Sequence, residues 1–237
     1  MFRSAASILA LLLAMLPQAA VALTGEITQL SGAVLARRAD GQSRALTVKS
    51  AVNEGDLLLT AENSFARVKF TDGTELAMRP GTQVRVDAYS YEEESPESNN
   101  VALSLLKGGV RSITGLLARR NPERFSVKVL TATIGIRGTH FGALYCSDDC
   151  ANVPAPSGGA PENGLHVDVA DGRIVVTSQG GSLELAVGEF GFVASALAAP
   201  VQVPANRGVR VLLPAQASSG AVPGRGFGSA GDLECAI

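Results

Sequence analysis

Residues 65–86, FARVKFTDGTELAMRPGTQVRV, alternate apolar and polar side chains with a period of two. Asp72-Gly73 and Pro80-Gly81 interrupt the alternation. In a β-strand, successive side chains point to opposite faces, so this period indicates strands with one buried and one exposed face. Asp-Gly and Pro-Gly favour tight reversals of the backbone. The segment therefore predicts three half-buried strands that are connected as hairpins.

The same pattern recurs along the chain. Turns are expected at Ala39-Asp40-Gly41 and Ala170-Asp171-Gly172, and Gly108-Gly109 is expected to reverse the strand that begins at Val101. The chain has 26 glycines, 46% hydrophobic and 18% charged residues, which suits a packed core with many tight turns. We therefore predict an all-β fold of stacked β-hairpins that form a twisted β-sandwich or a solenoid-like roll.

Residues 1–22 differ from the rest and are predicted to be a secretory signal peptide. Arg3 provides a basic start, residues 8–16 an apolar core, and Ala20-Val21-Ala22 a cleavage site of the small-x-small type. An uncleaved N-terminal anchor is the alternative. No later stretch reaches the roughly 20 apolar residues of a membrane span. We therefore expect a periplasmic or secreted protein without a membrane span after cleavage.

Beyond the signal peptide we expect one β domain with two irregular segments. Residues 23–145 are predicted to form the β domain, 146–164 a loop rich in cysteine, proline and glycine, and 165–199 further strands that pack on the same domain. Residues 200–237, rich in proline, glycine, alanine and serine, are expected to be a flexible tail. The formal net charge of -2 gives no basic excess for nucleic acid.

Three stretches carry a family resemblance: GDLLLTAENSFARVKFTDGTELAMRPGTQVRV at 55–86, LLKGGVRS at 105–112 and FSVKVLTATIGIRGTHFGA at 125–143. In order and spacing they resemble the FecR-type periplasmic domain, over about residues 25–145. The resemblance implies a solenoid-like roll. Members that give the family its name are sensors of iron-citrate uptake, with a cytoplasmic anti-sigma segment and a membrane helix. We expect this chain to lack those two parts and to act as a stand-alone envelope domain.

The segment that resembles the family's Arg-Gly-Thr motif contains Gly135, Arg137, Gly138 and Thr139. Glycine inside a strand marks a bulge or a close approach of another backbone. We therefore interpret these residues as structural, with Arg137 hydrogen-bonded to a carbonyl or carboxylate. Contact with a ligand is the alternative. The glycine spacing is not that of a dinucleotide-binding loop.

Cys146 and Cys150 enclose only three residues, and an exported protein meets an oxidising compartment. We predict a disulfide between them, which would stabilise the fold by roughly 2 kcal/mol. A redox or metal-binding pair, or pairing of either one with Cys235, are the alternatives. His140 and Cys146, six residues apart on one strand, are too distant for a nucleophilic pair. His140 and His166 do not complete a zinc site.

No cofactor and no catalytic residues are expected. Glu92, Glu93, Glu94 and Glu97 lack the spacing of a calcium loop and are interpreted as a solvated hairpin tip. We predict a non-enzymatic module for signalling or assembly in the cell envelope, which binds a protein partner through a sheet edge or loop. A carbohydrate- or cell-wall-binding module is the alternative. The absence of tryptophan and the presence of only three tyrosines count against it.

Overall fold

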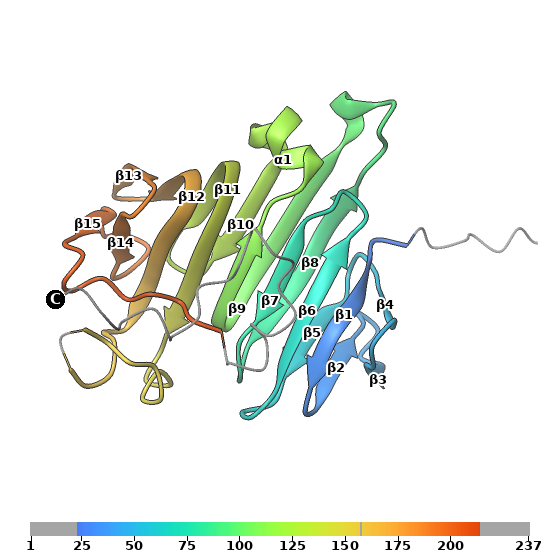
Figure 1. Ribbon diagram of the computed structural model, residues 1–237, viewed down its shortest axis with the longest axis horizontal. Coiled ribbons are helices and arrows are strands. Elements are labelled where there is room, and N and C mark those ends of the chain that lie inside the picture. Colours follow the sequence, from blue (N-terminus) through green and yellow to red (C-terminus); the bar gives the residue numbers. More distant parts are fainter. Residues whose placement is uncertain (1–22, 157, 214–237) are drawn as a thin grey trace, which may run out of the picture.

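The computed structural model describes residues 23–156 and 158–213, and the described part is built almost entirely of β-strands (Figure 1). The all-β prediction is confirmed. The helical elements are short: η1 (Pro96–Ser98), α1 (Leu116–Arg120) and η2 (Pro122–Arg124). The strands are β1 (Gly25–Ser31), β2 (Val34–Arg37), β3 (Ser43–Ala45), β4 (Ala51–Val52), β5 (Leu57–Thr60), β6 (Phe65–Phe70), β7 (Glu75–Met78), β8 (Gln83–Ser90), β9 (Asn100–Ile113), β10 (Phe125–Val129), β11 (Thr133–Cys146), β12 (Gly164–Ser178), β13 (Gly181–Ala186), β14 (Phe190–Val193) and β15 (Val201–Val203).

The strands form one 15-stranded sheet that consists of two halves. Half-sheet I has the order β3-β2-β5-β8-β9-β10-β11-β12-β13. Half-sheet II has the order β4-β1-β6-β7-β9-β11-β12-β14-β15. The long strands β9, β11 and β12 belong to both orders, because each contributes one end to half-sheet I and the other end to half-sheet II. These three strands therefore fold the sheet over on itself.

Each long strand changes half-sheet at a glycine. In β9 the change falls at Gly108, in β11 at Gly138 and in β12 at Gly172, and all three have positive φ. The hairpin turns expected at Gly108-Gly109 and at Ala170-Asp171-Gly172 are therefore wrong. The chain continues through both positions as a bent strand, because the residues on either side pair with neighbouring strands and not with each other.

The hairpins expected at Asp72-Gly73 and Asp40-Gly41 are present, because β6 pairs with β7 and β2 with β3. The hairpin expected at Pro80-Gly81 is wrong. The strand before it, β7, pairs with β6 and β9, whereas the strand after it, β8, pairs with β5 and β9. Pro80-Gly81 therefore carries the chain from half-sheet II to half-sheet I, next to the bend of β9.

One hydrophobic core joins the two half-sheets. It contains Leu58 and Leu103 of half-sheet I together with Ile27, Val68 and Leu76 of half-sheet II, all of them at most 1% exposed. Burying a side chain of this size contributes roughly 1.5–3 kcal/mol. The alternation of the sequence supplies these inward side chains, and the bends bring their two faces together.

The strands after the loop extend both half-sheets. β12 pairs with β13 in half-sheet I and with β14 in half-sheet II, so residues 165–199 continue the sheet of the preceding strands. Residues 200–213 differ from the expected flexible tail, since β15 pairs with β14 and Val211 is fully buried. The predicted signal peptide, residues 1–22, and residues 214–237, including Cys235, lie outside the described residues. Within the described part, no helix has the length and apolar character needed to cross a membrane.

Candidate functional site: the groove at the Arg-Gly-Thr motif

The Arg-Gly-Thr motif lies where β11 bends from half-sheet I to half-sheet II. Arg137 pairs with Arg173 and His140 with Asp171, so Gly138 and Thr139 of β11 lie opposite the single residue Gly172 of β12. Two residues opposite one is the definition of a β-bulge, which bends a strand and increases its twist. The motif therefore forms the bend itself.

Thr139 connects the bend to both neighbouring strands. Its side chain is 3% exposed, and its hydroxyl donates a hydrogen bond to the carbonyl of Arg173 in β12 at 2.9 Å. Its backbone N–H donates to the hydroxyl of Thr114 at 2.7 Å, directly after β9. Its carbonyl accepts from the Thr114 N–H at 3.0 Å. Thr139 therefore has a structural part in the fold.

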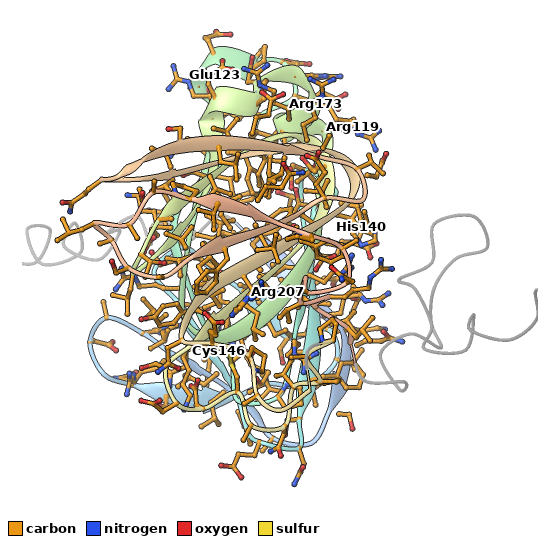
Figure 2. The ribbon with its side chains drawn as sticks, turned by 90° about the vertical axis from the view of Figure 1, so that its left-hand side faces the viewer. Arg119, Glu123, His140, Cys146, Arg173 and Arg207 are labelled. Atoms are coloured by element: carbon orange, nitrogen blue, oxygen red, sulfur yellow. A yellow bond between two sulfur atoms is a disulfide. The ribbon has the colours of Figure 1, made fainter. Side chains whose placement is uncertain are left out.

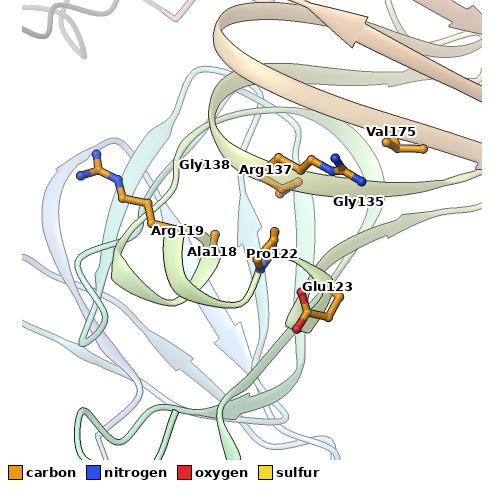
Figure 3. A pocket seen from close by; sticks show the side chains of 9 residues that line it. Ala118, Arg119, Pro122, Glu123, Gly135, Arg137, Gly138 and Val175 are labelled. Carbon is orange, nitrogen blue, oxygen red and sulfur yellow. The ribbon is translucent and has the colours of Figure 1, made fainter. Parts of the chain in front are cut away.

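A groove of about 450 Å³ opens beside this bend, between β11 and the helical connection that follows β9 (Figure 3). Gly135 and Gly138 of β11 line one wall of the groove, and because glycine has no side chain, nothing projects into the groove from these two positions. Its lining is completed by Ile136, Arg137 and Val175 from the strands and by Ala118, Arg119, Pro122 and Glu123 from α1 and η2. Gly138 thus belongs both to the bend and to one wall of the groove.

Arg137 is the exposed member of the motif. Its neighbours Ile136 and Thr139 are buried, whereas the Arg137 side chain lies along the groove (Figure 3). Among the described residues, its guanidinium has no hydrogen bond or ion pair, so the expected bond to a carbonyl or carboxylate is not made. Arg119 and Glu123 also line the groove, which therefore offers two cations and one carboxylate to a bound molecule. Guanidinium groups of this kind bind carboxylates with two parallel hydrogen bonds.

Cys146 and Cys150 form a disulfide with a Cα–Cα distance of 5.5 Å. Because Cys146 is bonded to Cys150, it is not a nucleophile, and it lies well apart from His140 (Figure 2). His140 lies in β11 and His166 in β12. The ring of His166 packs against Phe192, with 4.7 Å between ring centroids, and its Nε2 is 2.8 Å from the carbonyl oxygen of Glu162.

His140 is held neutral by its surroundings. Burial, and then the positive charge of Arg111, lower its pKa to about 4, although Asp168 and Asp171 act in the opposite direction. In the neutral ring, Nε2 accepts a hydrogen bond from Nε of Arg111 at 2.9 Å. The pKa of His166 is also lowered, mainly by burial.

These shifts predict a protein that loses stability in mild acid. An unfolded histidine binds a proton near pH 6.5, whereas folded His140 binds one only near pH 4. Between these values the unfolded state binds more protons, so the free energy of unfolding falls as the pH falls. The variant His140→Gln keeps an acceptor for Arg111 and should show a weaker dependence. Urea unfolding measured from pH 7.5 to 4.5 tests this, and equal slopes for both proteins would contradict it.

The acidic stretch after β8 is the tip of a hairpin. Ser90 of β8 pairs with Asn100 of β9, and Glu92, Glu93, Glu94 and Glu97 between them are exposed. No group of histidine, cysteine, aspartate and glutamate side chains with the geometry of a metal site occurs among the described residues. The tyrosines Tyr89, Tyr91 and Tyr145 are partly buried against the core. None of them forms the exposed aromatic platform of a typical carbohydrate site.

Sequence reasoning did not find a second polar cluster, on the outer face of half-sheet II. Arg111 of β9 and Asp168 of β12 form an ion pair at 2.9 Å, with side chains 7% and 5% exposed. Both also contact the backbone of Val211, which is 100 and 43 residues away in the chain. The only signal in the sequence is a charged residue inside each of two apolar strands, GVRS and HVDV.

Comparison with known proteins supports the family resemblance of the motif. No curated protein matches this chain. Two solved structures of a candidate anti-sigma factor from Parabacteroides distasonis ATCC 8503, at 1.65 and 2.50 Å resolution, are similar to it with TM-scores of 0.45 and 0.46 and 17% sequence identity. Each alignment covers 62% of this chain and 58% of the other. The family model described as FecR protein matches residues 56–175, which is just over half of the 237 residues and includes the Arg-Gly-Thr motif. The chain therefore belongs to the FecR family.

Proposed function

We propose that this protein is an exported, non-enzymatic FecR-domain module of the cell envelope. In this proposal it binds a protein partner in a signalling or assembly pathway, and the groove at Arg137 is its contact surface. Family membership supports a regulatory role. The predicted signal peptide supports export to the periplasm or the outside of the cell.

The observation that carries the proposal is that neighbouring residues of the motif have different roles. Gly138 and Thr139 serve the bend of β11 through backbone conformation and hydrogen bonds. Arg137 lies one residue earlier, and its side chain makes no hydrogen bond or ion pair among the described residues but lines the groove. An exposed arginine in a groove is a common anchor in protein interfaces, because it combines apolar contact with directed hydrogen bonds. We infer that a carboxylate of the partner, from an acidic side chain or a chain terminus, pairs with Arg137.

Site-specific crosslinking in the intact envelope tests this function. A photo-reactive amino acid is placed at Glu123, which lines the groove, and for comparison at Arg38, which is exposed in the turn after β2. We expect a defined adduct from position 123 and none from position 38. Arg137→Ala should weaken the adduct by at least about tenfold, as expected for a hot-spot arginine. Binding to purified peptidoglycan that requires Arg137, without a protein adduct, would contradict the proposal.

A further inference from the structure

The residues 209–212, which we call the strap, lie on the outer face of half-sheet II. In Figure 1 the orange segment after β15 crosses β12 and β11 towards the end of β9. It forms no strand there. Instead, side chains of the sheet hold its backbone. The Val211 N–H donates to Oδ1 of Asp168 at 2.8 Å, and Arg111 donates to the Val211 carbonyl at 2.7 Å. Arg79 donates to the carbonyl of Leu212.

The strap inserts two aliphatic side chains into a separate small core. Val209 and Val211 are 5% and 0% exposed, whereas Arg210 between them is exposed. Both valines are thus buried against the sheet, and a hydrogen bond of 3.0 Å from the Leu212 N–H to the Arg210 carbonyl turns the chain at Val211. The small core consists of Leu144, Cys146, Cys150, Val153, Val209 and Val211, and it is separate from the main core.

Gly142 makes room for the strap. A Cβ at this position would lie 2.6 Å from Cβ of Val211 and 2.3 Å from Oδ1 of Asp168. Gly142 also belongs to the outward-facing residues of β11, which alternate with Phe141 and Ala143 of the main core. A side chain here would therefore fill the place of Val211 and displace Asp168.

The sheet thus contacts the strap in two ways. The hydrogen bonds of Asp168, Arg111 and Arg79 to the strap reach only its backbone atoms, so these contacts do not depend on the side chains of the bound segment. The small core selects two aliphatic residues that are two positions apart. Backbone hydrogen bonds for affinity and pockets at alternate residues for selectivity are the features of extended-peptide recognition.

We propose that this face of half-sheet II is a peptide-binding site that the strap occupies in cis, and that its ligand in trans is an extended segment of a partner protein with two aliphatic residues two positions apart. The partner segment replaces the strap, which remains attached through residues 204–208. The apparent affinity for the partner then depends on the fraction of molecules in which the strap has left the site. This site shares no residue with the groove at Arg137, so the inference does not depend on the function proposed above.

The test is binding of a fluorescent peptide with the sequence of residues 207–213, RGVRVLL, to two forms of the full chain. In Val211→Asp, the charge opposes insertion of the strap into the small core, and the site becomes available. We expect the peptide to bind Val211→Asp at least about tenfold more tightly than the wild-type protein, in which the strap competes. A peptide with aspartate at both valine positions should not bind. Circular dichroism verifies that Val211→Asp is folded.

A second form covers the case in which Val211→Asp does not fold. A protease site is inserted between Asn206 and Arg207, both exposed, and the folded protein is cleaved there. The labelled peptide should then exchange with the cleaved segment, and adding Gly142→Val should abolish this exchange because it fills the Val211 position. Failure of both forms to bind the peptide would overturn the proposal. A wild-type dimer that Val211→Asp cannot form would overturn the assignment to a foreign partner, because it would identify a second copy as the occupant.

Discussion

Gly172→Ala should lower the free energy of unfolding by about 3 kcal/mol or more, or prevent folding altogether. Gly172 has a φ of +75°, where a residue with a side chain is strained by roughly 1–3 kcal/mol. An added Cβ would also lie 2.3 Å from the carbonyl oxygen of Gly138. That oxygen belongs to the backbone of the neighbouring bend, so it cannot move without disturbing β11. Urea denaturation followed by circular dichroism measures the loss.

Gly41→Ala is the matched control for this prediction. Gly41 has nearly the same backbone conformation, with a φ of +84°, but a Cβ at this position would meet no atom within 4 Å. The control should therefore show the conformational cost alone, about 1–2 kcal/mol. The difference between the two variants isolates the contact between the bends of β11 and β12. Equal losses in both variants would show that this contact has no effect on stability.

The second large effect is expected for Asp168→Ala, which should cost about 3–5 kcal/mol. The substitution leaves the guanidinium of Arg111 buried without its counter-ion and removes the acceptor for the Val211 N–H. A buried charge without a partner is far more costly than the loss of a pair at the surface. Because the strap loses a backbone contact, trypsin should also cleave faster after Arg210. Urea denaturation and a timed digest measure the two effects.

Glu184→Ala is the control, because Glu184 also forms an ion pair at 2.9 Å with an arginine, Arg173. The two side chains of this pair are 45% and 62% exposed, compared with 5% and 7% for Asp168 and Arg111. An exposed pair contributes about 0–1 kcal/mol because water solvates both partners after the change. The digestion rate at Arg210 should be unchanged. A loss below about 1 kcal/mol for Asp168→Ala would contradict the role assigned to the buried pair.

Local pattern was sufficient to find most strands and two of the hairpins. In residues 65–78, the alternation and Asp72-Gly73 predict β6, a turn and β7. These elements are present, because the residues that specify them lie within the same short segment. The same signal at Gly172 was misread as a turn. A glycine with positive φ serves a tight turn and a bend in a long strand equally well. Which one forms depends on strands that are distant in sequence.

For the candidate sites, too, some residues could be found from the sequence, whereas their roles depend on the fold. The resemblance to FecR domains directed attention to Arg137, Gly138 and Thr139, but only the fold shows that Thr139 is used internally while Arg137 lies in a groove with residues of α1 and η2. The peptide-binding face was not predictable. Arg111, Asp168 and Val211 are too far apart in the chain for any local pattern to connect them.

The sequence by itself determined that the chain forms β-strands with one apolar face, that two nearby cysteines can form a disulfide, and that a FecR motif is present. These properties follow from side-chain alternation and short spacings, which act over a few residues. The tertiary structure alone decided which glycines bend strands, that Arg137 lies in a groove and where residues 209–212 are held. The physical reason is that each of these depends on contacts between strands far apart in the chain, which exist only after the sheet has folded over on itself.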